Sequence, residues 1–474
     1  MRTLVWFRGK DLRVSDHAPL REAMAQGEVI PLFVLDPYFF APERARELPH
    51  RMQFLVDSLA ALEKNLAHLG SRLLVVRGKS VEVVPQLARA WHVDRVVAHR
   101  WTEPFGRERD RRVQAALSCP FQLFEGETLA APGSVRTAAG GAFTVFTPFA
   151  RAFRKSVLVG APLPAPRAVS PIPRDVRVES LPVPTCQDLG LVRNDRILPG
   201  GERAGRSRLD RFVRGPGGAY DVGRNQLDRE GTSRLSVDLK FGTQSVRRVW
   251  TESAHGLEEH PTALRAFQNE LLWREFAHQL LAERPELLRE PFRKGFVGFP
   301  WRKDDDGLWA WKLGKTGYPV VDAAARQLLG EGFVHNRARM ISASFLTKHL
   351  LIDFRLGEAH YLKYLTDGDW ALNDAGWQWS TGCGCDAQPY FRVFNPVTQG
   401  KTFDPVGDYV RRWVPELGAM PAAHIHAPWK APTEVLRKAG VVLGRTYPEP
   451  MVAHAYGRER FLATAKGHLS ENSA

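Results

Sequence analysis

Short apolar runs alternate with helical patterns over the first 130 residues of the chain. The runs are rich in Val, Leu, Ile and Phe, as buried strands are, and they occupy residues 3–9, 29–36, 72–78, 94–100 and 121–127. Between them, apolar residues at spacings of three and four predict helices near 16–26, 50–68, 80–91 and 104–118. Strands that alternate with helices predict a doubly wound parallel sheet, so residues 1–130 are predicted to form an α/β domain.

The pattern changes after residue 130. Residues 131–200 show little periodicity, and prolines cluster between Pro162 and Pro184, which predicts a Pro-rich interdomain connector pinned across the surface. Over residues 201–474 the apolar positions recur at helical spacing, most clearly at 262–283, 320–332 and 334–354. The second domain is therefore predicted to be all-α.

Composition narrows the classes of function. The formal net charge is +14, which favours a polyanionic partner such as nucleic acid, although a basic surface can also serve solubility alone. No apolar run approaches the roughly 18 residues that a membrane helix needs, and the N-terminus lacks the apolar region of a signal peptide. The chain has four cysteines, too few for a disulfide framework. We expect a cytoplasmic, monomeric protein with no membrane partner.

Common catalytic motifs are missing from the sequence. No G-x-G-x-x-G follows the first predicted strand, and there is no Walker A, H-E-x-x-H or G-x-S-x-G motif. Cys383 and Cys385 form a C-x-C without a second cysteine pair nearby, so we predict no metal site. Any ligand of the α/β domain is expected beyond the carboxyl ends of its strands.

Two segments have polar residues in arrangements that allow two interpretations each. GTSRLS at 231–236 places hydroxyls and an Arg on a turn before a helix, which suits a phosphate, or alternatively Thr232 or Ser233 is an ordinary N-cap. Within 262–283, Glu270 and Trp273 share a helix face, and Arg274 lies four residues after Glu270. The alternative there is an ion pair beside a core Trp.

A polar stripe further along the chain is more informative. Asp369, Asn373 and Trp377 recur at a spacing of four, so they share one face if the segment is helical. Asp and Asn make a poor core stripe because each needs a polar partner when buried. The three residues suit the wall of a flat, polar, aromatic ligand. Upstream, Asn336 and Met340 share another face, with Arg339 adjacent to it.

Long motifs in the second half resemble the FAD domain of the photolyase/cryptochrome family. They are GKTGYPVVDAAARQLLGEGFVHNRARMISASF and DGDWALNDAGWQWSTGCGCDAQPYF, with GTSRLS and NELLWREF in the expected order before them. LVWFRGKDLRVSDHAPL resembles the family's N-terminal α/β domain. The resemblance covers nearly the whole chain and is closest to bacterial cyclobutane pyrimidine dimer (CPD) photolyases. GCGCDAQPYF resembles the class III branch.

The resemblance implies a U-shaped FAD, reduced in the active state, within the helical domain. The segment that would hold the pyrophosphate comprises Tyr220, Thr232, Ser233, Arg234, Leu235 and Ser236. The positions beside the flavin comprise Asn336, Arg339, Asp367, Asp369 and Asn373. In the family, the equivalents of Arg339 and Asp367 pair with each other, and the equivalent of Asn373 faces flavin N5.

The resemblance also implies a DNA-binding pocket for the damaged bases. The catalytic set is expected to be Glu270, Trp273, Met340 and Asn373, and the DNA-binding set adds Arg224, Arg274, Arg337 and Gln399. Trp273 would stack on the dimer, and Glu270 would hydrogen-bond a thymine edge and stabilise its radical anion. Excited reduced FAD would donate one electron to the dimer, the ring would split and the electron would return.

Photoreduction of the flavin in most photolyases uses three tryptophans. Trp377 and Trp301 match the inner and outer members, but the middle position is Phe354, which is a poor electron carrier. The hypothesis is that electrons pass through another aromatic residue, with Trp370 and Trp379 as candidates, or that photoreduction is slow.

The N-terminal domain of many relatives binds an antenna chromophore. Glu103 matches an acidic position in folate-binding members, but its neighbours Trp101 and Thr102 differ from the pattern. Folate, a deazaflavin, a second flavin or no antenna all stay open.

The main hypothesis is light-driven repair of cyclobutane pyrimidine dimers in DNA, the activity of a deoxyribodipyrimidine photo-lyase. The alternative is a cryptochrome-type blue-light photoreceptor without repair activity. The four residues of the catalytic set favour repair. A non-catalytic DNA-binding module fits the flavin motifs poorly. Repair of (6-4) photoproducts is disfavoured because the pocket lacks the His pair associated with it.

Overall fold

The computed structural model describes residues 1–255 and 259–471, and the chain packs into two compact units. The first unit comprises Met1–Tyr220 and Ser233–Pro285, and the second comprises Asp221–Thr232 and Glu286–Ala474. Each unit is described by itself. The units are defined by packing, and the division into domains at residues 130 and 200 stays a prediction.

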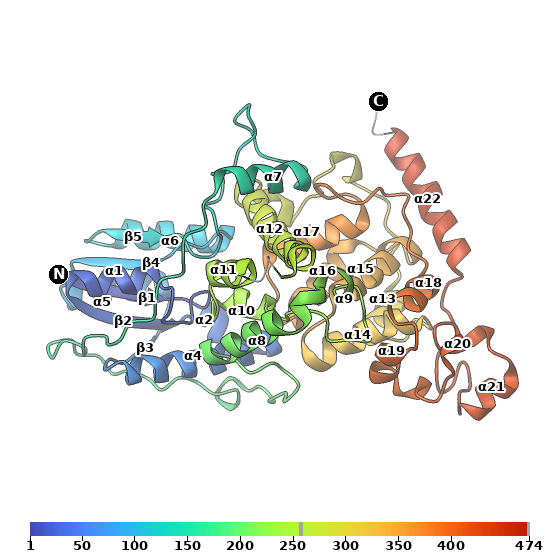
Figure 1. Cartoon of the computed structure of the whole chain (residues 1–474), viewed down its shortest axis with the longest axis horizontal. Helices are drawn as coiled ribbons and strands as arrows, with labels where there is room; N and C mark the ends of the chain where they lie inside the picture. Colours follow the sequence, from blue (N-terminus) through green and yellow to red (C-terminus); the bar gives the residue numbers. More distant parts are fainter. Residues whose placement is uncertain (256–258, 472–474) are drawn as a thin grey trace. The chain divides into compact units, whose positions relative to one another are not determined.

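The first unit contains a five-stranded parallel sheet of order β3-β2-β1-β4-β5 (Figure 1). Its strands are β1 (Arg2–Phe7), β2 (Glu28–Leu35), β3 (Leu74–Arg77), β4 (Arg95–His99) and β5 (Phe121–Phe124). The helices between them are α1 (Ala18–Gln26), α2 (Pro37–Phe40), α3 (Pro42–Arg46), α4 (Pro49–His68), α5 (Ser80–Ala90) and α6 (Pro104–Ala116). The predicted doubly wound α/β fold is confirmed, with every predicted strand present.

Both faces of this sheet are buried. Val5 and Phe7 belong to one apolar cluster, whereas Leu4 and Trp6 belong to another. Since successive side chains of a strand point to opposite faces, β1 contributes to the core on each side. This explains why the strands appear in the sequence as continuous apolar runs rather than as alternating ones.

The connector follows the surface of the first unit through backbone hydrogen bonds. Val169 N donates to Leu69 O at 2.7 Å, and Leu181 N donates to Val75 O at 2.8 Å, beside β3. The segment also includes α7 (Phe146–Ser156) and the short turn η1 (Gln187–Leu189), neither of which the sequence pattern predicted. These contacts satisfy backbone groups that a loose loop would leave to water.

Helices complete the first unit. They are α8 (Glu202–Arg214), η2 (Pro216–Ala219), α9 (Tyr220–Gly223, which ends in the second unit), α10 (Ser236–Phe241), α11 (Val246–His255) and α12 (Pro261–Glu283). Buried side chains of α8, α9, α11 and α12 form a separate core that includes Leu209, Phe212, Tyr220 and Phe267. The long helix predicted at 262–283 is thus confirmed as α12.

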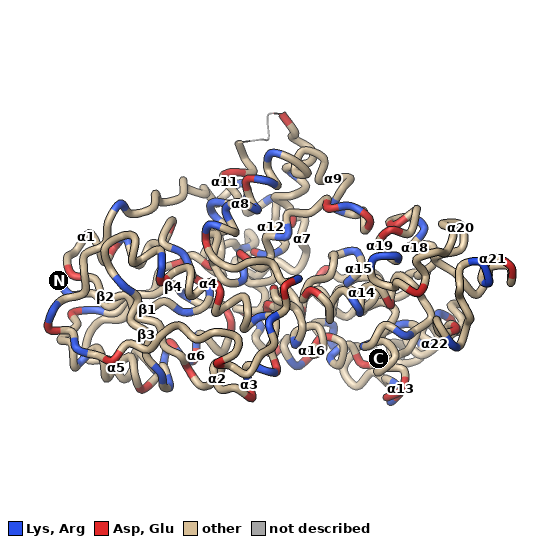
Figure 2. Tube along the Cα trace, turned by 90° about the horizontal axis from the view of Figure 1, so that it is seen from below, with Lys and Arg blue, Asp and Glu red and all other residues tan. Residues whose placement is uncertain are grey.

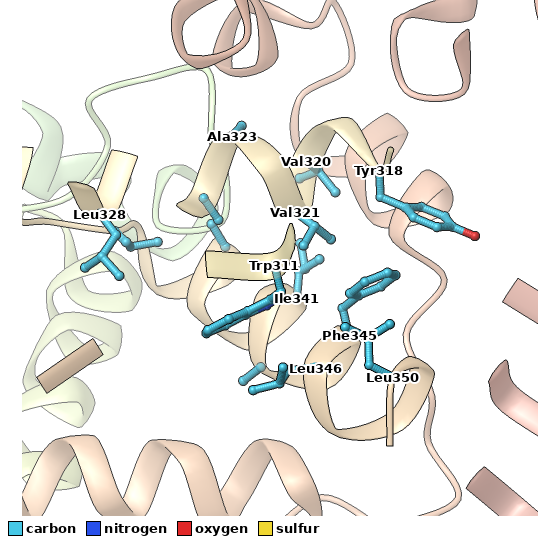
Figure 3. Packing of buried hydrophobic residues seen from close by; sticks show 14 of the residues in the cluster. Trp311, Tyr318, Val320, Val321, Ala323, Leu328, Ile341, Phe345, Leu346 and Leu350 are labelled. Atoms are coloured by element: carbon cyan, nitrogen blue, oxygen red, sulfur yellow. The ribbon is translucent and has the colours of Figure 1, made fainter. Parts of the chain in front are cut away.

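The rest of the second unit is helical. Its longer helices are α13 (Asp305–Leu313), α14 (Pro319–Glu331), α15 (Asn336–Ser344), α16 (Phe354–Tyr364), α17 (Trp370–Thr381), α18 (Pro396–Phe403) and α22 (His454–Glu471), and α19 (Asp408–Trp413) is a shorter one. Short ones are η3 (Pro285–Leu288), η4 (Lys294–Phe296), η6 (Pro415–Leu417), α20 (Ala422–Ile425), η7 (Pro428–Lys430) and α21 (Thr433–Lys438). Figure 3 shows Trp311 of α13 packed among side chains of α14 and α15. The all-α prediction is confirmed.

The single helix predicted at 334–354 is wrong in its second half. α15 ends at Ser344 and continues as the π-helical turn η5 (Phe345–His349). Leu351 then has a φ of 59°, in the left-handed region that ends helices. Asp353 starts α16 by accepting from Arg355 N. The apolar spacing continues through this break, so periodicity alone did not reveal it.

Charged residues are spread along the whole chain. Figure 2 shows Lys and Arg on the elements of both units, with Asp and Glu interspersed. None of the helices in the described part of the chain is long and apolar enough to cross a membrane.

Candidate active site

In the first unit, α12 presents a tryptophan whose ring plane is fixed. Trp273 stacks on Phe146 of α7 with ring centroids 3.8 Å apart and an interplanar angle of 6°. Phe276 meets the same indole edge-on at 5.9 Å. These contacts cover one face of Trp273 and hold its orientation, while the side chain stays only half-buried. A rigid aromatic surface of this kind suits stacking on a base.

The neighbour Arg274 has a role inside the first unit. Its side chain is 5% exposed, and its guanidinium donates to Glu127 O at 2.6 Å. Glu275 is fully buried and accepts from Leu129 N and Ala130 N, and burial raises its pKa to about 7. Both residues therefore fix residues 127–130 against α12. The DNA contact predicted for Arg274 stays a prediction.

The GTSRLS segment forms a strained turn before α10. Arg234 has a φ of 52°, and Ser233 Oγ accepts from Leu235 N at 3.3 Å. α10 starts at Ser236, and the residue before it, Leu235, makes no side-chain cap, so the alternative that Thr232 or Ser233 is the N-cap is wrong. The turn is supported by Asp238, which is buried and takes two hydrogen bonds from Arg208 at 2.6 and 2.8 Å.

The unit boundary lies within this segment, between Thr232 and Ser233. Tyr220, at the earlier boundary, is buried against Phe212 and Phe267 in the first unit. The backbone turn and its hydroxyls are compatible with a phosphate. The assignment of the whole segment to the pyrophosphate stays a prediction.

In the second unit, Arg339 pairs with Asp367. Arg339 Nη2 donates to the two carboxylate oxygens at 2.9 and 3.2 Å, and its Nε donates to Val334 O at 2.7 Å. The pairing that the family resemblance implied is therefore present. Asp367 is buried, whereas Arg339 is partly exposed, so the guanidinium keeps an accessible face for a ligand.

The predicted polar stripe of α17 is present, with Asp369 just before the helix. Asp369 is the N-cap, and one of its oxygens accepts from Ala371 N and Leu372 N. Asn373 donates from Nδ2 to Glu358 O at 3.1 Å, in the amide orientation that this contact assigns. That contact directs its Oδ1 towards other donors. Trp377 is 4% exposed, at the bottom of the stripe.

These residues fit a flavin chemically. A reduced isoalloxazine carries a hydrogen on N5, which is a donor, and Asn373 Oδ1 is a fixed acceptor. The Arg339 guanidinium can face the carbonyl oxygens of the ring, because Asp367 holds it in place. The donor and acceptor types around α15 and α17 therefore suit FAD.

Two carboxyls beside Asn373 were missed from the sequence. Burial raises the pKa of Glu358 to about 8, with the charge of Asp374 adding to the shift. Burial raises the pKa of Asp374 to about 7, although the hydrogen bond from Gln378 at 2.9 Å opposes the shift. Both groups therefore keep a proton near neutral pH more readily than ordinary carboxyls. Periodicity gave no signal for them, because each lies at a helix position that also suits a surface carboxylate.

A pocket of about 510 Å³ lies in the second unit. It brings together three predicted DNA-binding residues: Arg337 and Met340 from α15, and Gln399 from α18. The residues of the lining that sequence analysis did not assign to it are Trp379, Arg392, Val393, Phe394, Asn395, Thr398 and Phe403. Four of these belong to the non-periodic stretch before α18, which offered no signal. Trp379 was considered only as an electron carrier.

One side of this pocket is basic. Arg337 donates to Asn225 Oδ1 at 2.7 Å, and its guanidinium lies 4.4 Å from the centroid of the Phe403 ring. Burial and the nearby charge of Arg224 lower the pKa of Arg337. Two cations that repel each other in this way are stabilised by an anion between them. Arg224 and Arg337 thus suit a phosphate of a nucleic-acid backbone.

Asn336 lies at the edge of the same helix. It is exposed, and its Nδ2 lies 3.9 Å from Met340 Sδ, one turn further along α15. The shared face predicted for these two residues is confirmed.

The aromatic residues around Trp377 differ from a simple row of three. Trp377 meets Trp311 at 5.9 Å and Tyr361 at 5.3 Å between ring centroids, both edge-on. Trp301 meets Phe354 at 6.5 Å, so the predicted outer Trp lies beside the Phe that interrupts the row. Trp311 and Tyr361 were not predicted as electron carriers, because their positions match ordinary core aromatics.

In the α/β part of the first unit, Glu103 is already paired. It is buried and lies 2.9 Å from Lys10 Nζ and 3.3 Å from Lys240 Nζ. An antenna that used this carboxylate would compete with two lysines.

Comparisons with known proteins cover nearly the whole chain. A family model described as the FAD binding domain of DNA photolyase matches residues 267–467, and one described as DNA photolyase matches residues 3–167. The deoxyribodipyrimidine photo-lyase of Agrobacterium fabrum is 40% identical over 97% of this chain and 96% of its own length. That of Escherichia coli is 37% identical over 97% of each chain.

Solved structures agree with these similarities. A bacterial class III photolyase from Agrobacterium tumefaciens superposes with a TM-score of 0.92 at 38% identity, covering 99% of this chain and 98% of that one. A cryptochrome from Synechocystis gives 0.88 at 31% identity, with 98% and 99% covered. An archaeal photolyase from Sulfolobus tokodaii with two FAD molecules gives 0.84 at 29% identity, with 98% and 100% covered.

Proposed function

The chain belongs to the DNA photolyase and cryptochrome family, and from that premise we propose that it repairs cyclobutane pyrimidine dimers in DNA with light. The observation that carries the proposal is the pocket of about 510 Å³ in the unit that matches the FAD-binding model. Its lining combines basic side chains, Arg337 and Arg392, with aromatic ones, which are Trp379, Phe394 and Phe403. A volume of several hundred Å³ is what a small organic ligand needs.

Extrusion of the damaged bases is the first step that the chain must support. A fused dimer is poorly stacked and weakly paired, so it costs less to extrude than an intact base pair. Trp273 and Trp379 offer aromatic faces, and base stacking on such a face contributes about 1–3 kcal/mol per base. Arg224 and Arg337 would hold the backbone beside the lesion, without reading sequence.

When bound, reduced FAD supplies a light-driven one-electron donor. The residues of the chain would orient and protect the reactants. Asn373 would accept a hydrogen bond from the flavin, Arg339 would hold its ring, and Glu270 would hydrogen-bond a thymine edge. Met340 contributes an adaptable apolar contact that excludes water from the dimer.

We propose further that the protein works as a monomer in the cytoplasm. Its four cysteines form no disulfide bond, which fits a reducing compartment. A second flavin is one of the candidate antenna chromophores of the first unit.

The test is a repair assay on a thymine-dimer oligonucleotide under blue light and in the dark. We expect intact thymines to reappear, measured by chromatography, only in the illuminated sample and only with the flavin reduced. Binding without repair is expected in the dark. Undamaged DNA and DNA with (6-4) photoproducts are the controls. Flavin that responds to light while the dimers persist would contradict the proposal and favour the photoreceptor alternative.

A further inference from the structure

The part of the pocket lining that directly precedes α18 has no regular secondary structure. The segment 383–395, called the wall loop here, joins α17 to α18 and supplies Arg392, Val393, Phe394 and Asn395 to the lining. Its ends are well held: Cys383 N donates to Gln378 O at 3.1 Å, and Asn395 caps α18. Between these ends, irregular backbone needs other anchors to keep one conformation.

One buried lysine holds the pocket-lining end of this loop. Lys348 is 0% exposed, and its Nζ donates to Arg392 O at 2.8 Å and to Tyr390 O at 3.3 Å. The ammonium also lies 5.6 Å from the centroid of the Phe461 ring of α22. Two carbonyls and an aromatic face are the partners that a buried ammonium requires.

The position of Lys348 in the chain explains its reach. It belongs to the π-helical turn η5, in which Leu350 N donates to Phe345 O at 3.1 Å, five residues earlier. The phenyl ring of Phe345 and the side chain of Leu346 point into the buried cluster (Figure 3), which fixes the turn. Single π-turns within helices are frequent at functional sites.

We propose that Lys348 is a positioning residue for the pocket, holding the wall loop at a fixed separation from Arg337 and Met340. This inference rests on the proposed function, because it takes the pocket as the site of the pyrimidine dimer. The α15–η5 element carries lining residues of one wall and the anchor of the other. Lys348 is fully buried and is not part of the pocket lining, so it would set affinity for the lesion without entering the chemistry.

The unfavourable burial of the Lys348 ammonium supports a positioning role over a purely stabilising one. Burial lowers the pKa of Lys348 to about 7, so the folded protein holds a cation in an unfavourable environment. An apolar side chain of similar length would fill the same space without that penalty. The ammonium is therefore explained by the carbonyls that it holds.

The main test substitutes Lys348→Met, which keeps most of the side-chain length and removes the N–H donors. Hydrogen exchange of the flavin-loaded protein should accelerate within residues 383–395 and stay unchanged elsewhere. The Kd for a thymine-dimer oligonucleotide should rise about tenfold, equivalent to about 1.4 kcal/mol. The Kd for undamaged DNA should change less than twofold, and repair per absorbed photon at saturating substrate should be unchanged.

The matched control is Thr347→Val, one residue earlier. Thr347 is equally buried, and its Oγ1 donates to Ala343 O at 2.8 Å within its own helix, away from the wall loop. It should leave exchange in the loop and lesion affinity at wild-type values. If Lys348→Met does the same, the inference is overturned. Loss of flavin and of undamaged-DNA binding together with lesion affinity would show a general folding role and also overturn it.

A pH series on the wild-type protein serves if Lys348→Met fails to fold. Besides the guanidiniums of Arg392 and Arg460, the groups near Lys348 are the Cys383 thiol, whose pKa burial raises, and His349, whose pKa burial lowers to about 3. Between pH 6 and 9 only Lys348 changes charge among them. Preference for the lesion over undamaged DNA should fall over this range, and an unchanged preference contradicts the inference.

If the wild-type protein repairs no dimers, the proposed function fails. The exchange comparison still tests whether Lys348 anchors the loop, so the two failures are distinguishable.

Discussion

At the scale of single residues, the structure separates side chains that can meet a ligand from those committed to the fold. The ring of Trp273 stacks on Phe146, yet the side chain stays half-buried. The guanidinium of its neighbour Arg274 instead donates a hydrogen bond to Glu127 O. Adjacent positions on α12 thus have different tasks, and the difference lies in tertiary contacts that helical spacing does not encode.

Replacing Glu270 with alanine tests the predicted contact to the thymine edge. A hydrogen bond to a charged group contributes about 1.5–3 kcal/mol, so Glu270→Ala should slow repair about tenfold or more. The flavin should stay bound, as its absorbance in the purified protein will show. Glu283→Gln, on the same helix but paired with Arg136 at 3.2 Å, is the control and should repair normally. Colourless Glu270→Ala protein would mean that the residue is misplaced.

The aromatic contacts of Trp377 predict the route of flavin photoreduction. Trp377→Phe should abolish the light-induced loss of oxidised-flavin absorbance, measured by transient absorption. Trp311→Phe should slow it, because Trp311 contacts Trp377 at 5.9 Å whereas Phe354 interrupts the path to Trp301. Trp309→Phe, 60% exposed on the same helix, should have no effect. If Trp379→Phe slows the reaction and Trp311→Phe does not, electrons reach the flavin through Trp379 instead.

At the scale of elements, close packing between α16 and α17 fixes the depth of Trp377. A Cβ built on Gly357 of α16 overlaps the Trp377 indole and comes within 2.5 Å of Leu346 Cδ2. Gly357 has no positive φ, so the glycine is explained by space rather than by backbone conformation. The close packing of α16 against α17 therefore requires a residue without a side chain at position 357.

Substitutions of two helical glycines should consequently have opposite effects. Ala normally favours a helix over Gly by about 1 kcal/mol, and Gly376→Ala on α17, with open space around its Cβ, should raise the free energy of unfolding. Gly357→Ala should lower it by about 1–3 kcal/mol because the core is overpacked. Denaturant unfolding of both variants measures the difference. Equal stabilisation by both would show that α16 can shift freely.

The sequence predicted elements better than it predicted the site. Every strand and the helices α1, α4, α5, α6, α12 and α14 followed from periodicity, since burial of one helix face or of both sheet faces leaves a regular pattern, whereas the 18-residue helix α22 was not predicted. The wall loop has no period, and η5 with the chain break after it lies within continuous apolar spacing. Lys348, Glu358 and Asp374 were missed because their burial depends on segments distant in sequence. The family resemblance, by contrast, supplied pairs such as Arg339 with Asp367.

At the scale of the whole molecule, buried carboxyls make stability depend on pH. The pKa of Asp374 is raised to about 7 and that of Glu358 to about 8, so the folded state keeps protons that the unfolded state releases above about pH 4. Their contribution is complete at low pH and is lost as the pH rises through the folded pKa values. Each carboxyl lowers the free energy of unfolding by at most about 1.4 kcal/mol per pH unit in this window.

Asp374→Asn should flatten this dependence. The amide cannot ionise, so the urea midpoint of the flavin-loaded variant should fall less between pH 5 and 8 than that of the wild type. Glu434→Gln, at an exposed pair with Arg437, is the control and should follow the wild-type slope. An identical slope in Asp374→Asn would show that Asp374 is ionised throughout.

The crossing of the chain between the two units limits how this protein can be divided. Residues 221–232 belong to the second unit although they precede Ser233–Pro285 of the first. Within the second unit, Leu227 N donates to Phe403 O at 2.7 Å, and Asn225 receives a hydrogen bond from Arg337. If the gene were cut after residue 285, the downstream fragment would lack residues 221–232, which pack in the second unit. The upstream fragment would carry those residues without the helices that they contact. Neither fragment contains a complete unit. Recombination between homologues and split-reporter designs should therefore keep the two units of this protein together.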